Sequence, residues 1–339
     1  MNPSIQYDVS LRKLNTFDVE ARASRFIRIE SVAELVALHQ SPEWSAGPRL
    51  VLGGGSNLLL TRNFEGLVVQ IALRGKSKVA EDGSAWYVRA AAGENWDDFV
   101  DYTIEAGWGG LENLTRIPGT VGGAPIQNIG AYGVELVDRF WELEAFDTAL
   151  GSLVTLDARE CGFSYRDSVF KRAPGRHIVT SVSFRLAKNW HPVTDYGEVR
   201  KTLSKRGIAA PNPREVAEVV AEIRAGKLPD PDEIGSAGSF FKNPVITGPQ
   251  HAILITRFPM LVSYLQRDGS YKVAAAWLID QCGWKGRSIG QASVHPHQSL
   301  VLVNQGGATG ADILALAHAI IESVRARFGI ELEIEPVVV

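Results

Sequence analysis

Cysteine is scarce in this chain of 339 residues, which contains only two, Cys161 and Cys282. They lie far apart and lack C-x-x-C spacing, which argues against a disulfide framework and against a zinc site built on cysteine. The apolar segment of a signal peptide is also missing at the N-terminus, and no apolar run reaches the roughly 18–20 residues that span a bilayer. We therefore expect a soluble, cytoplasmic protein.

A surplus of charge of one sign is missing as well. The 35 lysines and arginines nearly balance the 38 aspartates and glutamates, which gives a formal net charge of −3. This balance offers no electrostatic reason to expect nucleic acid or an anionic membrane as the partner. Hydrophobic residues make up 45% of the chain, as in a packed globular protein, and the length suffices for two or three domains. We expect a monomer that acts on a small molecule.

The predicted elements indicate a mixed α/β (α+β) fold in three segments, residues 1–75, 76–210 and 211–329. The first segment is predicted as a βαβ unit, in which Ser31 and Glu34 form the capping box of the helix. The second combines a short helix with an antiparallel sheet. The strands predicted in these two segments lie at residues 26–29, 48–52, 66–73, 85–92, 140–147, 152–157 and 177–187.

The third segment is predicted to be largely helical. Apolar residues recur at helical spacing over residues 215–226 and 272–283. Thr309 and Asp312 make a capping pair for a longer helix whose apolar face is lined by Ile313, Leu316, Ala317, Ile320, Val324 and Phe328. The final IELEIEPVVV, residues 330–339, alternates as a strand does, so its three glutamates should share one face.

The chain has two glycine-rich loops, but it lacks the usual nucleotide-binding signatures. VLGGGSN, residues 51–57, is a strand followed by a turn whose backbone N–H groups can bind phosphate. It matches neither GxGxxG, since position 58 is leucine, nor the P-loop, and alone it could equally be a turn without a ligand. The second loop, RIPGTVGGAPIQNIGAYG, spans residues 116–133. Glycine this dense is expected where the main chain approaches a ligand, and two such loops suit a dinucleotide bound outside a Rossmann fold.

At these loops the chain resembles the FAD-binding region of the UDP-N-acetylenolpyruvoylglucosamine reductases, flavoenzymes of bacterial cell-wall precursor synthesis. The resemblance rests on long motifs that run in the family's order through nearly the whole chain. They are GGGSN, GLENLTRIPGTVGGAPIQNIGAYGVEL (110–136), CGFSYRDSVFK (161–171), KLPDP and GSAGSFFKNP (227–244), AAWLIDQCGWKG (275–286) and VHPHQSLVLVN (294–304). It implies a three-domain flavoprotein with a non-Rossmann FAD-binding fold of the vanillyl-alcohol-oxidase/PCMH type and a C-terminal α+β substrate domain. The strand at 330–339 would pack on residues 1–75.

The resemblance also implies the reaction. Hydride passes from NADPH to FAD and then to the vinyl carbon of an enolpyruvyl ether of UDP-N-acetylglucosamine, which becomes the lactyl ether of UDP-N-acetylmuramate. No histidine or cysteine of the glycine loops stands at a covalent attachment point, so the FAD is expected to be non-covalent. The implied cofactor-binding residues are Gly53, Gly54, Gly55, Ser56, Asn57, Pro118, Gly119, Gly122, Gly123, Ile126, Asn128 and Gly130.

Such a reduction leaves negative charge on a carbon and its carboxylate, so it needs a nearby cation and a proton donor. The resemblance gives these roles to Arg166 in SYRDS, whose planar guanidinium is permanently charged, and to Ser239 in GSFFKN. For an arbitrary arginine, an ion pair with Asp167 would be the ordinary interpretation. The third position falls on Glu335, with Glu333 as the alternative, although glutamates that share a strand face usually form a solvated surface.

The substrate-binding residues that the resemblance implies are Tyr165, Tyr196, Lys227, Asn243 and Gln298. Tyr196, in TDYGEV, matches the mobile tyrosine that closes over the substrate in one subtype of the family. His295 and His297 stand two positions apart without a third ligand nearby, so we expect no metal site.

Two other functions remain open on the sequence. A related flavin fold could serve an alcohol oxidase or dehydrogenase, which would have no need of Ser239, Arg166 and Glu335 together. A nucleotide-sugar binding protein without turnover would keep the substrate-binding residues and could be colourless.

Overall fold

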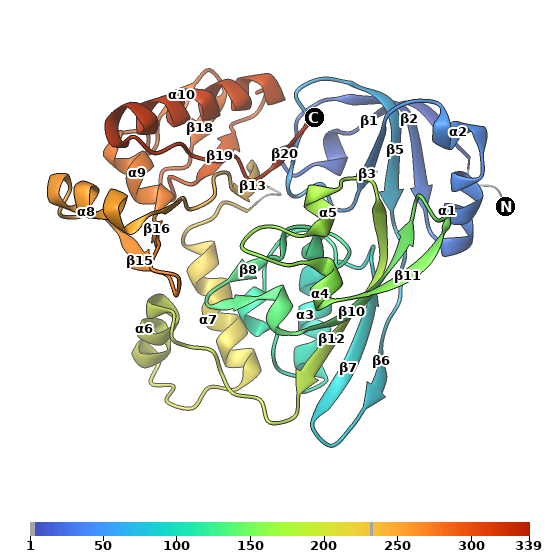
Figure 1. The fold of residues 1–339 in the computed structure, drawn as a ribbon, viewed down its shortest axis with the longest axis horizontal. Coiled ribbons are helices and arrows are strands. Elements are labelled where there is room, and N and C mark those ends of the chain that lie inside the picture. The colour runs from blue at the N-terminus through green and yellow to red at the C-terminus, as the bar shows by residue number, and fades with distance from the viewer. Residues whose placement is uncertain (1–3, 231–232) are drawn as a thin grey trace. The chain divides into compact units, whose positions relative to one another are not determined.

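The computed structural model describes residues 4–230 and 233–339, and the chain forms two compact units. Unit 1 takes in the residues up to Val9 with Ala23–Gly55 and Phe64–Ala225, and unit 2 comprises Ser10–Arg22, Ser56–Asn63 and Gly226–Val339. Each unit combines helices with sheets (Figure 1), which confirms the mixed α/β fold class. The division into three domains stays a prediction, because compactness alone does not say which parts fold independently.

A four-stranded sheet that lies mainly in unit 1 contains the predicted βαβ unit. Its strands are, in spatial order, β1 (Gln6–Ser10), β2 (Arg22–Ile29), β5 (Phe64–Ile71) and β3 (Arg49–Leu52). Strands β2 and β3 both run parallel to β5. The intervening helices are α1 (Val32–His39) and α2 (Pro42–Ser45). The Ser31 hydroxyl accepts from the Glu34 N–H at 3.2 Å, which confirms the capping box at the start of α1.

An antiparallel sheet forms the larger part of unit 1. Its strands are, in spatial order, β11 (Ser152–Asp157), β10 (Phe140–Asp147), β12 (His177–Ala187), β7 (Ala85–Ala91) and β6 (Lys76–Glu81). Helix α3 (Trp96–Glu105) begins at Asn95, whose side chain accepts from the Asp98 N–H. Trp96 and Phe99 of α3 pack on Phe184 of β12, with ring centroids 5.8 and 5.3 Å away. These contacts place α3 in the core that the sheet covers.

Short elements make up the rest of unit 1. They are η2 (Glu112–Leu114), η3 (Ala124–Gln127), β8 (Gly130–Ala131), β9 (Val134–Glu135), η4 (Leu136–Asp138), α4 (Ala158–Cys161) and α5 (Val169–Arg172), followed by the helices α6 (Gly197–Lys205) and α7 (Pro213–Ala225). Helices α6 and α7 share a small apolar core of Val199, Leu203, Val216, Val219 and Val220. Helix α7 confirms the helix predicted near residues 215–226.

Unit 2 holds a second apolar core, formed by a long helix and two small sheets. Helix α10 (Gly310–Phe328) has the predicted Thr309–Asp312 capping box, and the six apolar residues of its predicted face are all buried. One sheet has the order β13 (Gly235–Ser239), β19 (Val301–Asn304), β18 (Ala292–Val294), β17 (Ser288–Ile289), and the other β14 (Val245–Ile246), β16 (Tyr271–Val273), β15 (Ser263–Leu265). The remaining elements are η1 (Arg12–Leu14), α8 (Gly248–Arg257), α9 (Ala275–Gln281), and β20 (Val337–Val338) paired in parallel with β4 (Leu58–Leu59).

The helix predicted over residues 272–283 is wrong at its start. Helix α9 begins at Ala275, because Lys272 pairs with both β14 and β15 and Val273 pairs with Ser263 of β15. The two residues therefore extend a sheet rather than a helix. The apolar spacing of residues 272–283 fits either a helix or a strand at this end, and only the pairing with neighbouring strands decides between the two structures.

The strand predicted over residues 330–339 is also too long, since only β20 is paired as a strand there. The segment before β20 instead meets the chain after Ser239 at an isolated bridge between Ile334 and Phe241. Glu331 and Glu333 are exposed, whereas Glu335 is buried with 7% of its surface accessible. The three glutamates therefore do not share a solvated face.

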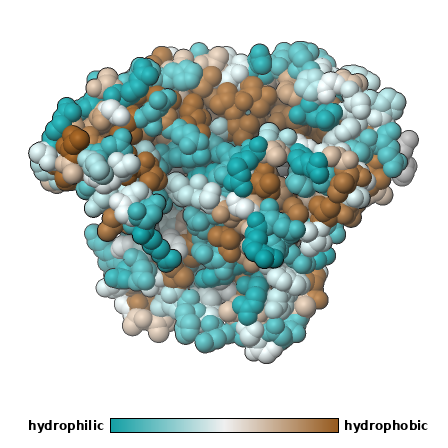
Figure 2. All heavy atoms as spheres, viewed as in Figure 1, coloured by the Kyte–Doolittle hydropathy of each residue, from teal (hydrophilic) through white to brown (hydrophobic). Residues whose placement is uncertain are grey.

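Apolar side chains reach the surface in several places without forming a membrane segment. Of the helices within residues 4–230 and 233–339, none has both the length and the apolar character that a membrane span requires. On the face shown in Figure 2, hydrophobic residues are interspersed with hydrophilic ones. Exposed examples are Ile253 of α8 and Tyr264 and Leu265 of β15. Such exposure is ordinary in monomers, and the expected monomer stays a prediction.

Candidate functional site

The two glycine loops of unit 1 lie against each other. A Cβ atom on Gly53 would stand 2.7 Å from Oγ1 of Thr120, and one on Gly54 would stand 3.0 Å from Cα of Gly119. A Cβ on Gly122 would likewise meet the Cβ of Ala92 at 2.5 Å. Side chains at Gly53 and Gly54 would push the two loops apart, and one at Gly122 would push its loop away from Ala92, so the glycines allow the backbone segments to form one cradle. The N–H groups of Gly122 and Gly123 donate to the carbonyls of Ala92 and Thr120 at 2.9 and 3.0 Å, so backbone donors for the phosphates of a dinucleotide such as FAD would come from other residues of the cradle.

Asn128 supports the second glycine loop from inside. It is fully buried and has a left-handed φ of 46° at the end of η3. Its Nδ2 donates to Oε2 of Glu135 at 2.8 Å and to the Ser164 carbonyl at 3.2 Å, and its Oδ1 accepts from the Val137 N–H at 3.1 Å. Both amide donors are thus used within the protein, and the side chain of Asn128 holds Glu135, Ser164 and Val137 around the loop.

Arg166 lies beside the same loop. Its Nη2 donates to the Gly130 carbonyl at 2.9 Å, and its guanidinium carbon stands 5.5 Å from the centre of the Tyr165 ring. Its φ of 54° is unusual for a residue with a side chain. Asp167 forms an ion pair with Arg172. The structure therefore brings together Arg166, Tyr165 and Gly130, three of the residues predicted from the sequence.

Tyr196 stands at the start of α6 and is 45% exposed. Its ring meets that of Tyr132 edge-on, with centroids 5.3 Å apart and an interplanar angle of 79°. Burial is the main cause that raises the pKa of Tyr132 to about 12, so this ring stays neutral near pH 7. The sequence analysis missed Tyr132, although it stands in the GAYG motif, two residues after Gly130.

In unit 2, Ser239 is the last residue of β13 and is half-buried. The register of β13 against β19 shifts between Ser236 and Ser239, and Gly238 has a left-handed φ of 68°. This bulge turns the strand just before the serine. Phe240 and Phe241 follow with 0% and 1% of their surfaces accessible and with ring centroids 5.3 Å apart. Ser239 is therefore followed directly by two buried and packed rings, which fix the backbone next to it.

Glu335 is held next to this strand. Its N–H donates to the Phe240 carbonyl at 2.9 Å, and the Lys242 N–H donates to the Glu333 carbonyl at 2.9 Å. Its own carbonyl accepts from Nδ2 of Asn57 at 3.4 Å. The side chain of Lys242 forms an ion pair with the exposed Glu333. Glu335 is thus the buried carboxyl group of the segment, whereas the exposed Glu333 forms an ion pair with a lysine whose side chain is 14% accessible.

The other residues predicted to bind substrate are spread over unit 2. The Oδ1 of Asn243 accepts from the Ala275 N–H at 2.9 Å, which holds the beginning of α9. Gln298 is half-buried, and its Oε1 accepts from the Leu300 N–H at 3.4 Å. Lys227 is half-buried just after α7. Pro231, which ends the KLPDP motif, lies outside the described residues.

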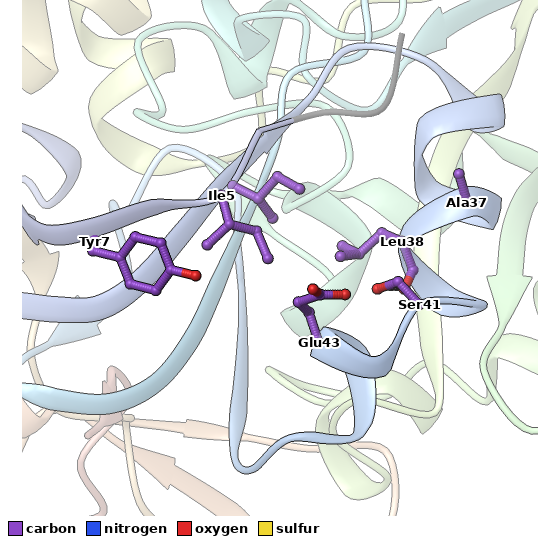
Figure 3. Close-up of a pocket in the computed structure, with 7 residues that line it drawn as sticks. Ile5, Tyr7, Ala37, Leu38, Ser41 and Glu43 are labelled. Carbon is purple, nitrogen blue, oxygen red and sulfur yellow. Dashed lines mark hydrogen bonds between the residues drawn. The ribbon is translucent and has the colours of Figure 1, made fainter.

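A surface pocket of about 310 Å³ in unit 1 is formed by other residues. Figure 3 shows Tyr7, Ser41 and Glu43 around it, beside Ile5, which precedes β1, and apolar side chains of β2 and α1. None of the predicted site residues lines it. In the part of the chain that the structure describes, no cluster of three or more histidine, cysteine or carboxylate side chains could hold a metal ion.

Comparisons with known proteins match both halves of the chain. Residues 230–339 match the family described as UDP-N-acetylenolpyruvoylglucosamine reductase, C-terminal domain. Residues 23–157 match the family described as FAD binding domain, and this region contains both glycine loops. The match to an FAD-binding family agrees with the cradle that the two loops form.

Individual relatives match along nearly the whole chain. It is 54% identical over 337 residues to the UDP-N-acetylenolpyruvoylglucosamine reductase of Burkholderia mallei, covering 98% of this chain and 97% of that protein. It is 54% identical over 330 residues to the protein of the same name from Paraburkholderia xenovorans, covering 96% and 95%. The crystal structure of UDP-N-acetylenolpyruvylglucosamine reductase (MurB) from Thermus caldophilus is similar with a TM-score of 0.66 and 27% identity, covering 100% of this chain and 99% of that one.

Proposed function

This chain belongs to the UDP-N-acetylenolpyruvoylglucosamine reductase family, and from that premise we propose how its residues perform the reaction. It is a flavoenzyme oxidoreductase of peptidoglycan precursor synthesis, which sets aside the alcohol oxidase and the binding protein without turnover. Its substrate is the enolpyruvyl ether of UDP-N-acetylglucosamine. When bound, FAD acts as the hydride carrier between NADPH and the vinyl carbon of this ether. We expect it to act as a monomer in the cytoplasm.

The residues of the protein stabilise the negative charge that hydride addition creates and supply the proton that neutralises it. Negative charge develops on the carbon next to the new C–H bond and on its carboxylate. Arg166 binds this carboxylate, since a guanidinium can offer two parallel N–H donors. Ser239 gives the proton of its hydroxyl to the carbanion-like carbon, and the carboxyl group of Glu335 stabilises the enolate or resupplies the proton.

One observation in unit 2 supports this assignment most strongly. The segment that ends in Glu335 is hydrogen-bonded to the residue after Ser239, the Glu335 N–H donating to the Phe240 carbonyl at 2.9 Å. The proposed donor and carboxyl group therefore stand on adjacent backbone segments, beside two buried phenylalanines that help to exclude water. A hydroxyl is a poor acid in water, so a fixed and dry position is what its role requires.

The cradle of the two glycine loops should bind the diphosphate of FAD, and Gly53→Ala should weaken that binding. The new Cβ would stand 2.7 Å from Oγ1 of Thr120. A steric conflict of this kind costs on the order of 1–3 kcal/mol, which corresponds to roughly tenfold weaker binding or more. The ratio of flavin to protein absorbance after gel filtration measures the loss.

The matched control removes the obstacle rather than the glycine. Thr120→Ala should keep its flavin, and the double variant Gly53→Ala, Thr120→Ala should regain it, since the Thr120 Cβ would be 3.9 Å away. Normal flavin content in Gly53→Ala would show that the loops do not bind the diphosphate.

Acid should release intact FAD from the wild-type protein, and flavin left on the denatured chain would contradict non-covalent binding.

Tyr196 and Lys227 should act on the sugar nucleotide and not on flavin retention, because both lie outside the glycine loops. Tyr196→Phe and Lys227→Ala should raise KM for the enolpyruvyl ether or lower kcat, with an unchanged flavin spectrum. Steady-state kinetics at fixed NADPH measures the effect. Purification of either variant without flavin would show that its assignment is wrong. The Tyr196 result also tests membership of the subtype with a mobile tyrosine.

A further inference from the structure

The chain between β12 and α6 has no regular structure, although Tyr196 stands at its end. Residues 188–196 belong to no helix or strand, and Figure 1 shows them as part of a long coil leading into α6. We call residues 188–196 the arm. A coil of this length is not fixed by its own backbone hydrogen bonds. The Lys188 N–H donates to the Ser84 carbonyl at 2.8 Å at its start, and side-chain contacts hold the residues beyond it.

Two buried side chains of η2 hold the arm. Glu112 accepts from the indole Nε1–H of Trp190 at 2.8 Å and from the Gly110 N–H at 2.5 Å. The Nδ2 of Asn113 donates to the Val193 carbonyl at 2.8 Å and to the Tyr132 carbonyl at 2.9 Å. Glu112 and Asn113 are 1% and 0% exposed. Hydrogen bonds shielded from water in this way are strong and specific.

The orientation of the Asn113 amide is determined by the two carbonyl groups to which it donates. Its Nδ2 faces two carbonyl oxygens, whereas its buried Oδ1 has no hydrogen-bond partner among the described residues. An unpaired buried acceptor is costly, so the two donor contacts decide the arrangement. They tie the arm to the backbone of Tyr132, whose ring contacts Tyr196. One amide thus connects the backbones that carry both rings.

We propose that Glu112 and Asn113 are positioning residues for Tyr196. They fasten the arm at Trp190 and Val193, and the second of these anchors stands three residues before Tyr196. Three residues of extended chain span at most about 10 Å, so the anchors limit how far Tyr196 can travel and return it to Tyr132. The inference rests on the proposed contact of Tyr196 with the sugar nucleotide.

Trp190→Phe tests the anchor, because it removes the indole donor and keeps an aromatic ring. KM for the enolpyruvyl ether should rise roughly tenfold, as expected for the loss of one hydrogen bond to a charged group. Flavin content and the rate of flavin reduction by NADPH should not change. Amide hydrogens at residues 193–196 should exchange faster with solvent, which a defect elsewhere would not cause.

The matched control is Trp96→Phe. Its indole donates to the carbonyl of Leu114, also in η2, at 2.9 Å, but it does not hold the arm. This variant should keep the wild-type KM and the wild-type exchange at residues 193–196. Glu112→Gln is the second test of the anchor if Trp190→Phe folds poorly, and it should change KM in the same direction.

Tyr196→Ala separates this inference from the proposed function. If Trp190 acts through Tyr196, Trp190→Phe should raise KM in the wild-type background and have no further effect in Tyr196→Ala. An equal effect in both backgrounds, or none in the wild type, would overturn the inference while leaving the substrate contact of Tyr196 intact. A normal KM in Tyr196→Ala alone would remove that contact and the inference with it.

Discussion

In Ser239→Ala, NADPH should reduce the bound flavin at a near-normal rate, whereas reoxidation by the enolpyruvyl ether should slow about 10²–10⁴-fold. The first step needs no proton on the substrate carbon. The second leaves negative charge on that carbon, which the Ser239 hydroxyl would quench. Stopped-flow absorbance of the flavin follows the two half-reactions separately. Ser239→Cys keeps a donor of similar size and should recover part of the rate.

Ser236→Ala is the control for packing. Ser236 lies on the same strand, β13, and is buried with 5% of its surface accessible. Its loss should leave both half-reactions close to the wild-type rates. Equal slowing of both steps in Ser239→Ala would mean that the residue only shapes the pocket. Reoxidation at the wild-type rate would exclude Ser239 as the proton donor.

The sequence predicted best those elements whose signals are local. The capping boxes of α1 and α10 and the apolar face of α10 depend on residues within a few positions of one another, and all are present. The predicted start of α9 was wrong because Lys272 and Val273 belong to β16, which pairs with β14 and β15. Local spacing contains no information about which distant strands come to pair with a segment.

The same limit applies to the candidate site. Long motifs pointed to Arg166 and Gly130, but the hydrogen bond between them joins residues far apart in the chain. The pairing of Tyr132 with Tyr196 and the anchoring of the arm by Glu112 are contacts of the same kind. Motifs predict which residues take part in the function of a family, and the structure shows which of these residues contact and position one another.

Glu335→Gln should slow reoxidation by the enolpyruvyl ether by about 10²-fold or more, which is the lower range for the loss of an acid–base group. Glutamine has nearly the same size and cannot gain or lose a proton at this position. The N–H of residue 335 should still donate to the Phe240 carbonyl, so the segment should stay in place. Flavin reduction by NADPH should be close to normal, and stopped-flow absorbance measures both steps.

Glu333→Gln is the matched control, two residues away on the same segment. Glu333 is exposed and forms an ion pair with Lys242, and its side chain is 66% accessible against 14% for the lysine. Its carboxylate is therefore largely solvated, unlike that of Glu335. This variant should therefore react at close to the wild-type rate. The opposite result, a slow Glu333→Gln and a normal Glu335→Gln, would move the third role to Glu333. Burial argues for the first outcome, because a carboxyl group shielded from water interacts more strongly with developing charge than one at the surface.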